Sequence, residues 1–144
     1  IERFGSKFML RIPISSLPLR KQKLLANSPL ATPTYISIEG HHYDNTVCAI
    51  IYEIQVGLQC GHDVITENLK ARFSDFEKLD KALRPILDKN HYCCQLPPKR
   101  WFGNTEESFV CEREESLRNY IEYFLSNPEI SKSKEFQSFF HLSQ

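Results

Sequence analysis

Strand-like and helix-like sequence patterns occupy separate parts of this chain. Residues 35–39 alternate apolar and polar side chains, residues 49–56 form an apolar run rich in β-branched residues, and residues 64–73 supply a third strand-like segment. Gly57 and Gly61 indicate a turn between the second and third segments. Three strands in succession with short connections favour an antiparallel β-meander.

Helix-like patterns follow the strands. The motif Ser74-Asp75-Phe76-Glu77 predicts a capped helix start, and Pro85 predicts a break or kink after about ten residues. Residues 95–102 carry two consecutive prolines and predict an extended loop. A second helix capped near Asn104, a turn at residues 127–128 and a short final helix complete the chain. We therefore expect an α+β fold in which a three-stranded antiparallel β-meander packs against a helical subdomain of three to four helices, with the proline-rich loop between the first two long helices.

Charge divides the chain into two parts. Residues 1–34 contain six basic residues and one acid, whereas the remaining 110 residues contain 12 basic and 17 acidic residues. Four prolines leave no helical or strand period in the first part, which predicts that residues 1–33 are a basic, Pro/Ser-containing extension that is loosely ordered or wraps the domain. We expect residues 34–142 to fold without it. The net negative charge of this domain disfavours a nucleic-acid partner. If the domain binds an anion, a few basic side chains placed close together must bind it.

Several classes of function lack their sequence signals. The five cysteines form no C-x-x-C pair, and we expect reduced thiols in a cytosolic protein. His41 and His42 have no third metal ligand at a sensible spacing, so we expect no metal and no cofactor. No glycine-rich phosphate loop, G-x-S-x-G or H-E-x-x-H motif is present, and we expect no enzyme. No apolar run approaches the ~20 residues of a membrane span, and the start at Ile1 suggests a fragment of a longer protein.

One arginine interrupts an apolar helical stripe. Arg113 follows Phe109 by four residues and precedes Leu117 by four, which places its charge on the face that packs inward. A snorkelling or salt-bridged arginine would explain this position. The functional alternative is an anion site, because a guanidinium binds phosphate and vicinal oxygens bidentately.

Two further cations lie at positions that restrict their side chains. Lys99 directly follows the double proline, whose stiffness lowers the entropy that binding would cost. Arg72, followed by the aromatic Phe73, lies at a strand-to-helix junction, where helix amides favour anions. A solvated surface residue remains the alternative interpretation for both.

Four motifs, in order along the chain, resemble motifs of the PX (phox-homology) family, in particular those of sorting nexins. Residues 70–76 (K-A-R-F-S-D-F) resemble its R-R-[YF]-S-D-F motif, and residues 96–99 (L-P-P-K) with residues 102–104 (F-G-N) resemble its proline-rich loop. Arg113-x-x-x-Leu117-x-x-Tyr120 resembles its R-x-x-x-L-x-x-[YF] helix, and the chain end (L-S-N-P-E-I, then F-F) also fits. The resemblance covers residues 34–142. One departure is Ala71, where the family often has its first arginine.

The resemblance implies a site for a phosphoinositide headgroup. By it, Arg72 would bind the 3-phosphate, Phe73 would stack under the inositol ring, Lys99 would bind the 1-phosphate, and Arg113 would hold the ring hydroxyls at positions 4 and 5. This set implies phosphatidylinositol 3-phosphate as the membrane partner, on the cytosolic face of early endosomes, and a role in trafficking or sorting.

The same loop supplies candidates for membrane insertion. Trp101 follows Lys99 by two residues, and tryptophan favours the membrane interface. Arg100 would add attraction to anionic lipids. Packing of Trp101 on its own domain is the structural alternative. For the whole domain, the alternative function is a PX-fold protein-interaction module with weak or different phosphoinositide specificity, which would bind a protein partner.

Overall fold

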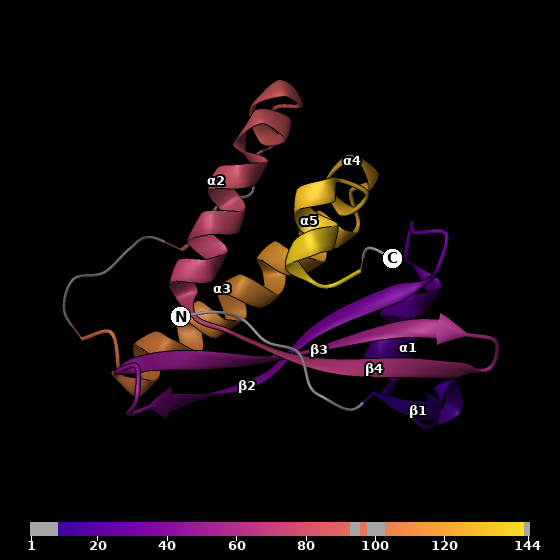
Figure 1. Ribbon diagram of the computed structural model, residues 1–144, viewed down its shortest axis with the longest axis horizontal. Coiled ribbons are helices and arrows are strands. Elements are labelled where there is room, and N and C mark those ends of the chain that lie inside the picture. Colours follow the sequence, from indigo (N-terminus) through magenta and orange to yellow (C-terminus); the bar gives the residue numbers. More distant parts are fainter. Residues whose placement is uncertain (1–8, 93–95, 98–102, 143–144) are drawn as a thin grey trace.

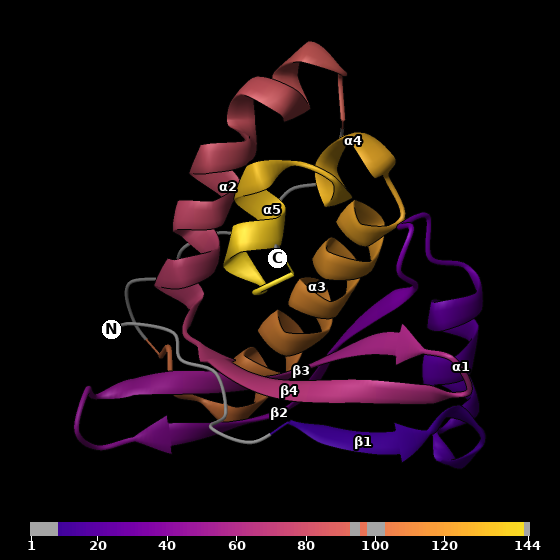
Figure 2. The same ribbon diagram turned by 45° about the vertical axis from the view of Figure 1, so that its right-hand side comes forward.

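The computed structural model describes residues 9–92, 96–97 and 103–142. Its elements are β1 (Leu10–Pro13), a 3-10 helix η1 (Ile14–Ser16), α1 (Leu19–Ala26), β2 (Thr34–Asp44), β3 (Ala49–Cys60), β4 (Asp63–Ala71), α2 (Phe73–Lys89), α3 (Glu107–Leu125), α4 (Pro128–Ser131) and α5 (Lys134–Phe139). Strands precede the long helices, and the helices α2 to α5 gather on one side of the sheet (Figures 1 and 2). The predicted α+β fold class is confirmed. No helix in the described ranges is long and apolar enough to cross a membrane.

The sheet within the described residues has four antiparallel strands, in the order β1-β4-β3-β2. The predicted meander is the run β2-β3-β4, with Ile36 opposite Val56 and Leu58 opposite Ile65. The fourth strand, β1, was not predicted. It has four residues and is largely exposed, so it lacks the alternation that indicates a strand.

The main core lies between the sheet and the helices α2 to α5. Buried side chains of the sheet meet the apolar stripes of α2 and α3 and the aromatic end of the chain. The largest fully buried ones are Tyr52, Ile54, Leu69, Phe76, Leu83, Leu87, Tyr120, Phe124, Phe136 and Phe140. The final short helices therefore close the core, as the phenylalanines near the chain end predicted.

A second apolar cluster covers the other face of the sheet. Tyr35 alternates with Ile36 on β2, and because neighbouring strand residues face opposite ways, Tyr35 belongs to this cluster and Ile36 to the main core. Leu17 and Leu25, both from the N-terminal segment, pack there with Val64. The segment before residue 34, which was expected to have no regular period, thus contains β1, η1 and α1 and supplies buried side chains.

Gly57 lies within β3 and not in a turn, as the sequence had suggested. It is opposite Tyr35, and a Cβ atom placed on it would lie only 2.1 Å from Cε2 of that ring. The glycine is therefore required by the close approach of Tyr35. Gly61 does occupy the predicted turn, with a φ of +64°.

The helix boundaries differ from the predicted ones in three places. Arg72 occupies the N-cap position of α2, and its backbone N–H donates to the Asp75 carboxylate at 2.9 Å. The N-cap position of α3 is Glu106, and Asn104 lies before it. Pro85 does not break α2, which continues to Lys89. Pro85 and Lys81 are both exposed, so water can replace the backbone hydrogen bond that the proline removes.

Candidate functional site

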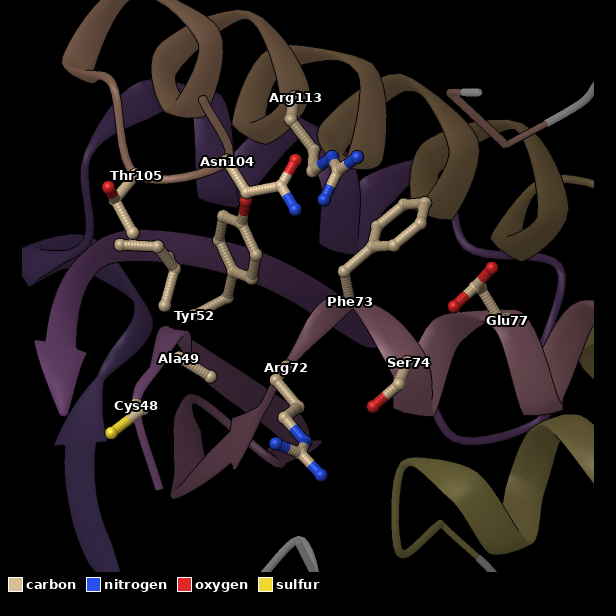
Figure 3. Close-up of a pocket in the computed structure, with 11 residues that line it drawn as sticks. Cys48, Ala49, Tyr52, Arg72, Phe73, Ser74, Glu77, Asn104, Thr105 and Arg113 are labelled. Carbon is tan, nitrogen blue, oxygen red and sulfur yellow. The ribbon is translucent and has the colours of Figure 1, made fainter. Parts of the chain in front are cut away.

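A pocket of about 360 Å³ opens where three parts of the chain meet: the β2–β3 turn with the start of β3, the β4–α2 junction with the start of α2, and the segment entering α3 with the first half of α3. Its lining residues come from all three parts (Figure 3). They are Cys48, Ala49, Ile50, Tyr52, Arg72, Phe73, Ser74, Glu77, Asn104, Thr105 and Arg113. The structure therefore brings three of the predicted site residues, Arg72, Phe73 and Arg113, to one cavity.

Arg72 is placed by the change from strand to helix. Its backbone is extended and the next residue begins α2, so its side chain leaves the chain beside the helix N-terminus. Nε of Arg72 is buried and has no hydrogen-bond partner among the described residues. A buried donor without a partner is costly, and the positive end of the helix dipole lies next to it. This corner of the pocket is suited to an anion.

Arg113 enters the pocket from α3, where only 8% of the residue is exposed. Its Cζ lies 3.7 Å from the ring centroid of Phe73 and 4.4 Å from that of Phe109. Figure 3 shows the side chain extending toward Phe73, while Arg72 extends in another direction. The cation–π contact fixes the guanidinium of Arg113 at the pocket wall.

The other pocket walls, among the residues that the structure describes, carry polar groups and the carboxylate of Glu77. Glu77 follows Phe73 by one helical turn, and Ser74, Asn104 and Thr105 add neutral hydrogen-bonding groups. Burial raises the pKa of Tyr52 to about 12, and the nearby charge of Arg113 opposes that rise. Tyr52 therefore keeps its phenol proton at neutral pH.

Sequence reasoning did not identify these polar walls. Glu77 had been interpreted only as part of a helix-capping motif, Ser74 as part of that motif and of the motif at residues 70–76, and Tyr52 only as part of a strand. No sequence signal marks Tyr52 as a pocket residue, because its role depends on Arg113 from a distant helix. The predicted residues Lys99, Arg100 and Trp101 lie outside the described residues.

Comparisons with known proteins agree on one family. The PX domain model matches residues 60–143. Sorting nexin-20 of Rattus norvegicus is 29% identical over 90 residues, which cover 62% of this chain and 29% of that protein. The PX domain-containing protein kinase-like protein of Rattus norvegicus is 31% identical over 68 residues, which cover 47% of this chain and 11% of that protein. The chain thus matches less than a third of the length of either relative.

Solved structures show the same fold. The mouse SNX19 PX domain with a bound sulphate ion has a TM-score of 0.60 at 21% identity, covering 77% of this chain and 100% of that one. A designed CISK-PX domain has a TM-score of 0.56 at 22% identity, covering 73% of this chain and 96% of that one.

This chain belongs to the PX domain family and is sorting-nexin-like. PX domains are typically non-catalytic modules that bind phosphoinositide lipids and associate peripherally with membranes from the cytosol. The phosphoinositide-binding, membrane-targeting function implied by the sequence therefore holds at the level of the family.

Proposed function

We propose that this domain binds phosphatidylinositol 3-phosphate and so docks its parent protein on the cytosolic face of early endosomes, in trafficking or sorting. The observation that carries the proposal is the convergence of two partly or fully buried guanidiniums, Arg72 and Arg113, with Phe73 on one pocket. A bound inositol phosphate would bring a phosphate and ring hydroxyls to these guanidiniums, and arginine binds such oxygens bidentately.

Each residue has a distinct role in this proposal. Arg72 binds the 3-phosphate, because its buried Nε and the N-terminus of α2 offer donors at one point. Arg113 donates to the ring hydroxyls at positions 4 and 5. Phe73 supplies an apolar wall for the inositol ring and also holds Arg113 in place. Lys99 binds the 1-phosphate, and Trp101 with Arg100 contacts the membrane.

Glu77 favours a lipid whose inositol ring carries only one phosphate besides the linking 1-phosphate. Its carboxylate lines the same pocket as Arg113 and Phe73. A further phosphate on the ring would bring a second anion toward this carboxylate, and like charges in a partly buried site repel strongly. The pocket therefore favours a ligand with one ring phosphate besides the linking 1-phosphate.

The test is sedimentation of the domain with vesicles that differ only in the phosphoinositide. We expect binding to vesicles containing phosphatidylinositol 3-phosphate, and at least tenfold weaker binding to those containing the 4-phosphate or the 4,5-bisphosphate. Replacing Glu77 by glutamine should reduce the discrimination against the bisphosphate. Folded protein that sediments with none of these vesicles would overturn the proposal and favour the protein-interaction alternative.

A further inference from the structure

Three side chains outside the pocket each place one metal-binding atom in a small volume. His41 comes from β2, and Glu107 and Cys111 come from the first turns of α3. His41 Nε2 lies 3.3 Å from Glu107 Oε1, and Cys111 Sγ lies 3.3 Å from the same oxygen. All three ligand atoms lie within 4.8 Å of one another. Glu107 and Cys111 are four residues apart, so they share one face of the helix.

These separations suit a tetrahedral ion. Zinc binds imidazole nitrogen, thiolate sulfur and carboxylate oxygen at about 2.0–2.3 Å, which puts neighbouring ligands of a tetrahedron roughly 3.3–3.6 Å apart. The two 3.3 Å separations, both to Glu107 Oε1, lie at the short end of that range. A set of one nitrogen, one sulfur and one oxygen favours zinc over magnesium or calcium, which prefer oxygen ligands alone.

The histidine is oriented as metal-binding histidines usually are. His41 Nδ1 lies 2.7 Å from Glu114 Oε1, and the other oxygen of Glu114 accepts a hydrogen bond from Arg118. Arg118 also donates to the backbone carbonyl of Ile38 at 3.3 Å. A carboxylate on Nδ1 holds the proton there and leaves Nε2 for a metal. Side chains of His41 and Glu114 are 17% and 11% exposed, so this orientation is held by packing.

We propose that His41, Glu107 and Cys111 bind one Zn²⁺ ion, with water or a partner's side chain at the fourth position. In the metal-free domain, Cys111 donates its thiol proton to Glu107, and a doubly protonated His41 donates there from Nε2. Zinc binding replaces these protons with the ion, and they leave to solvent.

The ion would join β2 to the start of α3. His41 is paired with the pocket residue Tyr52 across the sheet, with ring centroids 6.3 Å apart, so the cross-link lies beside the proposed lipid pocket without using a pocket residue. Metal binding that occurs only in the folded state raises its thermal stability. The domain should therefore melt at a higher temperature with zinc.

Cobalt spectroscopy tests the site directly. Co²⁺ added to reduced, metal-free domain should give a thiolate-to-cobalt charge-transfer band, together with the strong visible bands of tetrahedral cobalt, at one ion per chain. Cys111→Ser and His41→Ala should each weaken binding at least tenfold. Two matched controls should bind cobalt as the wild type does. Cys60→Ser alters an exposed cysteine outside the site. His42→Ala alters the histidine next to His41 in the sequence, which lies near Glu53.

A second measurement excludes unfolding of a variant as the cause of its weaker cobalt binding. Each variant is melted without metal, and zinc should raise the melting temperature of the wild type and the two controls but not of Cys111→Ser. Unchanged cobalt bands in Cys111→Ser would overturn the proposal. So would bands that disappear only when Cys93 and Cys94 are replaced by serine. No lipid is present, so the outcome is independent of the proposed lipid function.

Discussion

Replacing Arg113 by alanine removes a guanidinium that lies 3.7 Å from the Phe73 ring centroid and is 8% exposed as a residue. The contact with Phe73 exists before a ligand arrives, so its loss affects mainly stability, by roughly 0.5–2 kcal/mol. The loss on binding is that of hydrogen bonds from a charged donor, about 1.5–3 kcal/mol. Vesicle affinity for phosphatidylinositol 3-phosphate should therefore fall roughly 10- to 150-fold.

The assay is vesicle sedimentation over a range of lipid concentrations, with thermal melting of each variant. Arg113→Ala should also discriminate less between the 3-phosphate and lipids phosphorylated at positions 4 and 5, because its proposed contacts are the hydroxyls at those positions. The matched control is Arg84→Ala on α2, where the lost arginine pairs with Asp80 and Asp88 outside the pocket. Folded Arg113→Ala with the wild-type affinity and lipid profile would refute this reasoning.

Three further predictions concern the proline-rich loop and the N-terminal segment. Lys99→Ala should lower affinity about tenfold for every phosphoinositide alike, as vesicle titrations would show, because all of them carry the 1-phosphate. Trp101→Ala should weaken vesicle binding by on the order of 1.5–3 kcal/mol but leave the affinity for a soluble short-chain lipid unchanged, and the fluorescence of this single tryptophan should shift to the blue on vesicles. Removal of residues 1–29 should lower the free energy of unfolding by roughly 3–6 kcal/mol in denaturant titrations, because Leu17 and Leu25 are lost from the second apolar cluster.

Each of these has a result that contradicts it. If Lys99→Ala lowers the affinity for one phosphoinositide only, the lysine contacts a ring phosphate and not the 1-phosphate. Absence of a fluorescence shift, with binding shown by sedimentation, would mean that Trp101 does not enter the membrane. A truncated domain with unchanged stability would show that the N-terminal segment is dispensable after all, as its sequence pattern had suggested.

The sequence predicted those strands and helices that bury apolar side chains at regular spacing or in long runs. β2, β3 and β4 alternate or carry long apolar runs, and α3 has an apolar stripe at helical spacing, so these were found. β1 and α1 were missed because they are short, and α1 buries only Leu25. Their position depends on the second face of the sheet, which no local pattern reveals.

The site was only partly predictable for a related reason. Arg72 and Phe73 belong to a contiguous motif, and Arg113 stood out as a charge on an apolar stripe. Glu77 and Tyr52 enter the pocket through tertiary contacts between β3, α2 and α3, and they carry no comparable signal. The same holds for His41, whose partners Glu107 and Cys111 are more than 60 residues away in the chain.

The most direct test of the proposed lipid function is the vesicle affinity of Arg72→Ala. The buried Nε of Arg72 has no partner among the described residues, so the substitution removes an uncompensated donor and should leave the fold intact. The account predicts at least tenfold weaker binding to vesicles containing phosphatidylinositol 3-phosphate, with an unchanged or slightly higher melting temperature. A folded Arg72→Ala domain that binds these vesicles as tightly as the wild type would contradict it.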